Sequence, residues 1–430
     1  VHYSVTANNK VVRSGKVSLD IEPQASKEFT VPVGNLKPQA GTEYFVNFNV
    51  TTVEKEPLIP IGHEIACDQF RLPIESPKKA FKTSGPKLTV STNGDNLSAS
   101  SSKVNFVFNR KTGIVTSYKV DGTEYFSEGF GIQPNFWRAP TDNDYGNGMP
   151  KRLQVWKESS KNFNVTDATV TMDGNNAVVN VNYLLPAGNL YIVNYTIYPS
   201  GAVNVAARFT STDMDAAQTE VSEATRTATF TPGRDAARKE ASKLNVPRIG
   251  VRFRLPASMN QVEYFGRGPA ENYLDRNAGS MVGLYKSTAE ELYFPYVRPQ
   301  ENGHHTDTRW VSLSTGKKGL LIQADNTIGF NALRNSIEDF DDEEATGLPR
   351  QWSNFTPEQV ANHDEAAAKN VLRRQHHINN ITPRDFVEVC VDLKQQGVAG
   401  YDSWGSRPEP AYTLPANREY NWGFTLIPLK

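Results

Sequence analysis

Hydrophobic and polar residues alternate along much of the chain. Residues 179–183 read VNVNY, residues 191–197 read YIVNYTI, and residues 44–50 read YFVNFNV. Successive side chains of a β-strand point to opposite faces, so each run presents one apolar and one wetter face. We therefore predict a β-strand at each of these places, with one side of it buried.

Four dipeptides typical of tight turns separate runs of this kind. They are Asn93-Gly94, Asp121-Gly122, Asp173-Gly174 and Ser200-Gly201. Glycine adopts backbone angles that other residues avoid, and such pairs between alternating runs are a signal for a β-hairpin. The pattern predicts an antiparallel hairpin around each dipeptide.

Residues 1–74 form the first unit of the pattern. Three short apolar runs lie at 11–21, 27–33 and 43–53, with turn residues between them. A unit of this size with short strands fits an immunoglobulin-like β-sandwich.

A linker and a much larger unit follow. Residues 75–87 are rich in Pro, Lys and Ser and have no apolar period, which is typical of a linker. From residue 88 to residue 430, strand follows strand without an internal repeat. We therefore predict an all-β chain, with a small β-sandwich (1–74), a linker (75–87) and a large domain (88–430) of two very large stacked sheets.

One helix interrupts this β pattern. Thr356 is followed by Pro357 and, three residues on, by Gln359, while Phe355 is placed to meet Val360. This is a capping box with a hydrophobic staple, so the sequence predicts a helix that begins at Thr356.

Composition excludes several classes of partner. The 430 residues carry 46 basic and 47 acidic side chains, a net charge of −1, so no basic field is available for nucleic acid or an anionic membrane. No apolar run reaches the length of a membrane span. Cys67 and Cys390 are far apart, which indicates neither a zinc knuckle nor a disulfide framework and leaves the compartment open. Because the chain begins directly in a strand pattern at Val1, we expect it to be part of a longer protein whose remainder is N-terminal.

Residues 262–310 hold the densest mixture of aromatics, prolines, glycines and charges. Gly266 and Gly268 precede Pro269, and this spacing predicts a tight turn. Glu271 and Glu301 lie in the same stretch. We expect these two carboxylates to anchor turns or arginines by hydrogen bonds, and not to perform chemistry.

Two acids in the segment 138–146 suggest a calcium loop, but the pattern fails. A ligand is missing at Gly146, and Leu153 stands where a bidentate glutamate is needed. We expect Asp142 and Asp144 to pair with Arg138 or to cap backbone amides instead. His304 and His305 are adjacent, so in a strand they face opposite sides and cannot bind one metal ion.

Trp404 lies between glycines in the segment GVAGYDSW, next to Asp402. A flat indole face packs well against the C–H face of a sugar ring. The alternative is that this large apolar side chain folds back into its own domain. The residues of the segment leave both interpretations open.

Five sequence blocks together resemble the small C-terminal domain of the large β-galactosidases of glycoside hydrolase family 2. The blocks are PNFWRAPTDND (134–144), FGRGPAENYLDR (265–276), PYVRPQENG (295–303), TDTRW (306–310) and GVAGYDSW (397–404). The resemblance implies that residues 88–430 form a β-supersandwich. It also implies that the whole enzyme hydrolyses terminal β-D-galactosides with retention.

The same resemblance implies roles for a few residues. Trp404 would stack on the sugar, and Asp402, Asp142, Asn143 and Gly146 would border the active site. The catalytic glutamates would lie on an N-terminal (β/α)8 barrel, for which this chain lacks the alternating helices, so no catalytic residue is assigned here. Magnesium and sodium would be held mainly by that barrel, and no metal ligand or cofactor is assigned to this chain.

Two alternatives remain at this point. An autonomous carbohydrate-binding module would show a second exposed aromatic beside Trp404. An aldose 1-epimerase would pair His304 or His305 with Glu271 or Glu301 in one cleft, as acid and base.

Overall fold

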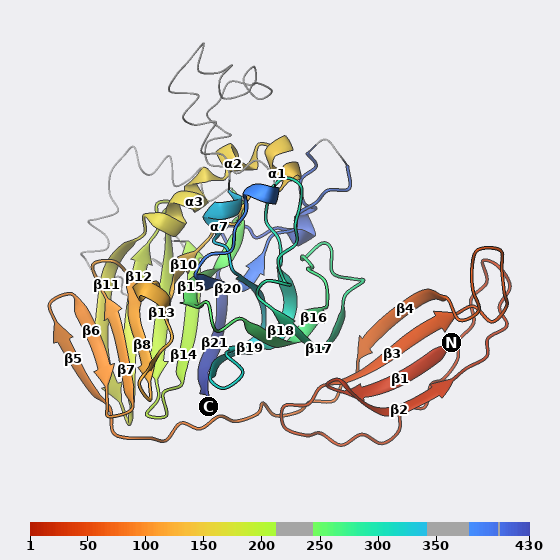
Figure 1. The fold of residues 1–430 in the computed structure, drawn as a ribbon, viewed down its shortest axis with the longest axis horizontal. Helices are drawn as coiled ribbons and strands as arrows, with labels where there is room; N and C mark the ends of the chain where they lie inside the picture. The colour runs from red at the N-terminus through yellow and green to blue at the C-terminus, as the bar shows by residue number, and fades with distance from the viewer. Residues whose placement is uncertain (212–243, 342–377, 403–404) are drawn as a thin grey trace, which may run out of the picture.

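The computed structural model describes residues 1–211, 244–341, 378–402 and 405–430. The helix predicted at Thr356 lies outside these residues, as does Trp404. Among the described residues nearly all regular structure is β-strand, which confirms the all-β prediction (Figure 1). No helix in these ranges has the length and apolar character to cross a membrane.

Four strands form the N-terminal sheet, in the antiparallel order β2-β1-β3-β4. They are β1 (His2–Ala7), β2 (Lys10–Lys16), β3 (Tyr44–Thr51) and β4 (Glu64–Arg71). The strand predicted at 27–33 is wrong, since this segment has no regular structure. Pro32 has no N–H to donate to a sheet. Phe29 instead lies edge-on to Phe48 of β3, with 6.5 Å between ring centroids.

Two further sheets make up the large domain. The smaller contains β5 (Thr89–Asn93), β6 (Asn96–Ser100), β7 (Val104–Asn109), β8 (Ile114–Val120) and β9 (Thr123–Glu124), in sequence order. The larger follows the path β10-β15-β20-β19-β21-β14-β13-β12-β11, and β16, β17 and β18 branch from β19.

The strands of the larger sheet are β10 (Gln133–Asn135), β11 (Asn164–Asp173), β12 (Asn176–Leu184), β13 (Asn189–Ile197), β14 (Val203–Ser211), β15 (Arg248–Pro256), β16 (Gln261–Gly268), β17 (Met281–Thr288), β18 (His305–Ser314), β19 (Gly319–Leu333), β20 (Phe386–Gln395) and β21 (Tyr420–Leu429). All four predicted hairpin turns are confirmed. Their glycines have positive φ angles: Gly94 57°, Gly122 77°, Gly174 58° and Gly201 97°.

The core lies between the two sheets of the large domain. Alternate residues of β12 and β13 are buried, as the sequence pattern predicts. Tyr195 of β13 contacts Phe106 of β7, with 5.6 Å between ring centroids. Tyr118 of β8 donates to the carbonyl of Gly201 at 2.6 Å. The predicted stacking of sheets is therefore present, and both sheets contribute aromatic residues to one core.

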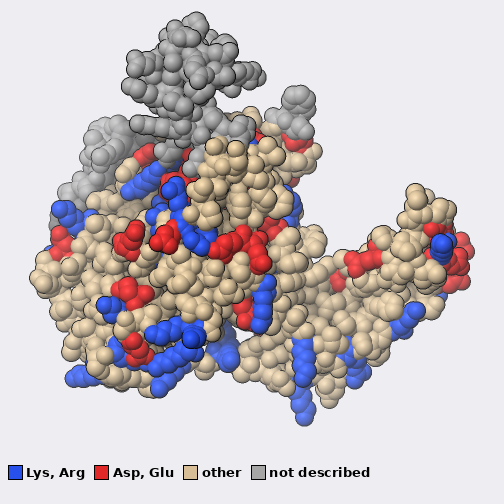
Figure 2. Space-filling view, viewed as in Figure 1, with Lys and Arg blue, Asp and Glu red and all other residues tan. Residues whose placement is uncertain are grey.

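The two ends of the large domain differ (Figure 1). Short helices lie at one end: α1 (Asp142–Gly146), α2 (Met149–Arg152), α3 (Gln154–Lys161) and α7 (Ile337–Phe340). The segment 75–87 runs along the other end, where Phe81 packs on Tyr198 with 5.3 Å between ring centroids. On the face drawn in Figure 2, acidic and basic side chains of the described residues are interspersed.

The tight turn predicted at Gly266, Gly268 and Pro269 begins later than expected, because both glycines belong to β16 and the chain bends only at Pro269 and Ala270. A Cβ on Gly266 would lie 2.5 Å from the hydroxyl oxygen of Thr308. A Cβ on Gly268 would lie 2.3 Å from the hydroxyl oxygen of Tyr264. The glycines therefore allow close packing inside the sheet.

Candidate functional site

Asp144 fixes the N-terminal turn of helix α1. Thr141 caps the helix, because its hydroxyl accepts from the amide of Asp144 at 3.1 Å and its own amide donates to the Asp144 carboxylate at 3.0 Å. The same carboxylate forms a buried ion pair with Arg138 at 2.9 Å. Asp144 thus pairs and caps as expected, whereas Asp142 pairs with Arg298 at 3.0 Å and not with Arg138.

The helix supports the segment that surrounds Trp404. The Asn143 amide donates to the carbonyls of Val398 at 3.2 Å and Ser406 at 2.7 Å. A Cβ on Gly405 would lie 2.4 Å from the carbonyl carbon of Gly146, so the two backbones touch. The structure therefore places Asn143 and Gly146, two of the predicted border residues, directly against this segment.

Asp275 fixes the start of the same segment. Its carboxylate accepts from the amides of Val398 at 3.0 Å and Ala399 at 2.7 Å. Ala399 has a φ of 54°, a left-handed conformation that these bonds offset. A Cβ on Gly397 would lie 2.4 Å from this carboxylate, so glycine permits the approach.

Asp402 links the residues before Trp404 to those after it. Its carboxylate accepts from the amide of Ser406 at 3.0 Å. Asp142 lies on the other side of α1, where its amide donates to Gln300 at 2.9 Å. The flanks of Trp404 are thus anchored on three of the sequence blocks, while Trp404 itself is not among the described residues.

Glu271 and Glu301 are both engaged in hydrogen bonds, in line with the expectation from the sequence. Glu271 accepts from Arg276 at 2.9 Å, from the amide of Gly303 at 2.7 Å, and from the hydroxyl of Tyr296. Glu301 is buried and pairs with Arg248 at 3.1 Å.

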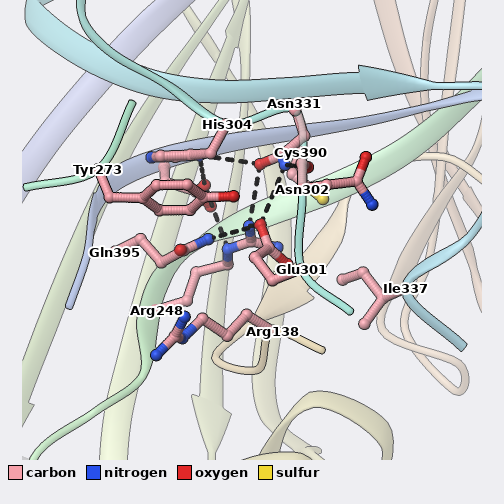
Figure 3. A network of polar contacts seen from close by, with 12 residues as sticks. Arg138, Arg248, Tyr273, Glu301, Asn302, His304, Asn331, Ile337, Cys390 and Gln395 are labelled. Atoms are coloured by element: carbon pink, nitrogen blue, oxygen red, sulfur yellow. Dashed lines mark hydrogen bonds and ion pairs between the residues drawn. The ribbon is translucent and has the colours of Figure 1, made fainter. Parts of the chain in front are cut away.

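A buried polar network surrounds Arg248 on β15. Figure 3 shows the side chains of Arg248, Glu301, Asn331 and Gln395 pointing toward one another from different strands and loops. Arg248 donates to Asn331 at 2.9 Å and forms an ion pair with Asp392 at 3.2 Å. Gln395 donates to Glu301 at 2.9 Å. One guanidinium therefore lies between two buried carboxylates.

Asn331 is the hub of this network. Its amide nitrogen donates to Glu301 at 3.0 Å and to the carbonyl of Asn302 at 2.8 Å. Its oxygen accepts from Arg248 and lies 2.9 Å from Nδ1 of His304. Because an amide oxygen only accepts, His304 carries its proton on Nδ1.

Burial sets the charge of the two titratable groups that face each other here. His304 Nδ1 and Asp392 Oδ2 are 3.9 Å apart. Burial and the nearby Arg248 lower the pKa of His304 to about 3, so the ring is neutral at neutral pH. Burial raises the pKa of Asp392 to about 7, against the opposing effect of Arg248. Neither oxygen of Asp392 accepts a hydrogen bond from the described residues.

The raised pKa of Asp392 predicts a pH dependence of stability. Between about pH 4 and about pH 7 the folded chain holds a proton that the unfolded chain has released. The contribution of Asp392 to the free energy of unfolding therefore falls as pH rises through this window and is constant above it. In urea titrations from pH 4 to pH 8, we expect Asp392→Asn to become progressively more stable relative to the unmodified chain up to about pH 7. A difference that does not vary with pH would contradict the prediction.

The cavity beside this network is too small for a sugar. Its volume is about 20 Å³, and its lining includes Arg248, Glu301 and Asn331. Such a space suits a water molecule, whereas small-molecule sites occupy about 300–1,000 Å³. His304 and Glu301 both contact Asn331, but the cavity beside them is much smaller than the cleft that an epimerase would need.

The sequence analysis did not single out Arg248 or Asp392, although one feature of the sequence indicates them. Arg248 opens the apolar run of β15, and Asp392 interrupts the apolar run of β20. A charged residue within an otherwise apolar strand indicates a buried partner of opposite charge. The sequence of one strand, however, does not show on which other strand that partner lies.

These observations define an all-β domain with a buried charged network and an anchored loop at one end. Residues 100–426 match the family described as "Beta galactosidase small chain", and residues 1–73 match "Beta-galactosidase, domain 4". The chain belongs to the β-galactosidase small chain family.

Similar proteins carry the same name. The β-galactosidase of Priestia megaterium is 29% identical over 431 aligned positions, which cover 99% of this chain and 36% of that protein. The β-galactosidase of Streptococcus thermophilus is 24% identical over 432 aligned positions, which cover 99% of this chain and 35% of that protein. The chain thus spans about a third of the length of these curated relatives. Among solved structures, a galactose 1-epimerase from Lactobacillus acidophilus aligns with a TM-score of 0.38 and 8% identity, over 80% of this chain and 98% of its own.

Proposed function

We propose that this chain is the C-terminal portion of a retaining β-galactosidase of glycoside hydrolase family 2. In this proposal the whole enzyme hydrolyses terminal β-D-galactosides, and this portion completes the active site with the segment 397–407. The catalytic carboxylates would come from the N-terminal remainder, which would form a barrel. The family and the relatives of the same name support the β-galactosidase assignment.

The anchoring of the segment around Trp404 carries the proposal. Asp275 and Asn143 hold its first residues, and Asp402 holds its return. Fixing a loop at both ends reduces the entropy that an aromatic side chain would lose on binding a sugar. This arrangement supports a role for Trp404 in stacking on the substrate.

The acidic residues of this chain fit a supporting role. A retaining glycosidase needs two carboxyl groups about 5 Å apart that are open to substrate. Glu271 and Glu301 are instead tied to arginines and backbone amides. In the described part of the chain, no three His, Cys, Asp or Glu side chains are grouped as metal ligands.

Reconstitution tests the proposal. This chain and the N-terminal remainder of the same protein are purified separately and assayed with lactose and a nitrophenyl β-galactoside, alone and mixed. We expect activity only in the mixture. Turnover by this chain alone, or full activity of the remainder alone, would overturn the proposal.

A carbohydrate-binding module is the second candidate. Tyr401, three residues from Trp404, is 66% exposed, and a second exposed aromatic is the feature that such a module would show. The same assay separates the two candidates, because a binding module leaves the activity of the remainder unchanged.

A further inference from the structure

A cleft lies between the N-terminal sheet and the large domain, and residues of both parts and of the connecting segment line it. Its volume is about 510 Å³, within the range of small-molecule sites. Its lining includes Glu43 from the first unit, Lys78 from the connecting segment, and Trp310, Asp325 and Asn326 from the large domain.

Direct contacts between the two units fix the walls of this cleft. Phe45 of β3 packs edge-on against Phe265 of β16, with 6.4 Å between ring centroids. Arg309 of β18 holds Glu43 through Nη2 at 2.8 Å and Nε at 3.0 Å. This two-pronged ion pair gives the cleft a defined shape.

Several hydrogen-bonding groups at the cleft have no partner among the described residues. The Gln323 side chain donates to the backbone carbonyl of Lys79, and the Lys78 side chain donates to that of Asp325. In contrast, the indole N–H of Trp310, the carboxylate of Asp325 and the amide of Asn326 make no hydrogen bond within the described ranges. Trp310 is partly exposed and packs beside Phe265.

We propose that this cleft binds a neutral mono- or disaccharide, separately from the site around Trp404. The Trp310 face would pack on the C–H face of a sugar ring. Asp325 would accept from sugar hydroxyls, and Asn326 would both donate and accept. The mixture of Glu43 and Asp325 with Arg309 and Lys78 leaves no single-sign field, which favours a neutral ligand over an anion.

Calorimetric titration of lactose and of galactose into the intact chain tests this proposal. The variants are Trp310→Ala and Asn326→Ala, and circular dichroism checks that both are folded. Asn326 is exposed, so its truncation leaves folding intact. Trp404→Ala is the comparison variant for the segment 397–407, and Asn164→Ala, which truncates an exposed asparagine on the edge strand β11, is the control.

We expect saccharide binding to the unmodified chain that weakens about tenfold or more in Trp310→Ala and measurably in Asn326→Ala. The Asn164→Ala control should bind as the unmodified chain does. Absence of binding, binding that ignores both cleft variants, or binding lost only in Trp404→Ala would each overturn the proposal. These outcomes concern binding by this chain and are independent of the reconstitution assay.

Discussion

Arg248→Met should destabilise the chain by about 3–5 kcal/mol, because it removes the cation from a buried network and leaves its carboxylates unpaired. Arg248 is fully buried and lies 3.1 Å from Glu301 and 3.2 Å from Asp392. Methionine fills much of the space but supplies no charge and no donor to Asn331. Urea unfolding followed by circular dichroism measures the loss as a shift of the transition midpoint.

Arg208→Met is the matched control. Arg208 pairs with Glu419 at 3.3 Å, but both side chains remain about a quarter to a third exposed, at 26% and 31%. An exposed pair contributes about 0–1 kcal/mol, so this variant should be nearly as stable as the unmodified chain. The loss in Arg248→Met should also be smaller at low pH, where Asp392 takes up a proton. Equal losses in the two variants would show that Arg248 does not hold the network together.

The hairpins of this fold could be predicted from the sequence because their signals are local. The glycines at 94, 122, 174 and 201 all take the positive φ angles that tight turns require. The alternation in 179–183 and 191–197 likewise matches the burial of β12 and β13. In each case the residues that specify the structure lie within a few positions of one another.

Local signals failed where a distant contact decides the conformation. Gly266 and Gly268 look like turn residues, but the neighbouring Thr308 and the nearby Tyr264 explain them as positions of close packing within β16. Similarly, alternation in β3 predicted one wet face, yet Phe45 on that face is buried. Its partner Phe265 lies 220 positions away, where no local pattern can indicate it.

The candidate site divides in the same way. The resemblance implied that Asn143, Gly146 and Asp402 border one active site, and the structure places Asn143 and Gly146 against the segment that contains Asp402. Asp275 lies in a recognised block, but its role depends on the amides of residues 398 and 399, which only the folded chain places beside it. Recognition of a block therefore indicates a candidate site, and the contacts show which part of the segment each residue holds.

Trp404→Ala should lower kcat/KM of the reconstituted enzyme for lactose by about 10- to 100-fold, if the proposed stacking on the sugar holds. Burial of a large aromatic face contributes about 1.5–3 kcal/mol, and each 1.4 kcal/mol changes a rate or equilibrium constant by about tenfold. The anchored flanks of the segment should keep the backbone in place, so the loss should report the side chain alone.

Two further variants accompany this measurement: Trp404→Phe tests partial rescue, and Trp310→Ala is the control. Phenylalanine keeps a flat apolar face and should recover part of the activity lost in Trp404→Ala. Trp310 lies in the cleft between the N-terminal sheet and the large domain, so its truncation should leave kcat/KM nearly unchanged. Equal activity of Trp404→Ala and the unmodified enzyme would remove Trp404 from the active site. The segment 397–407, held by Asp275 and Asn143, would then be explained by packing within the domain.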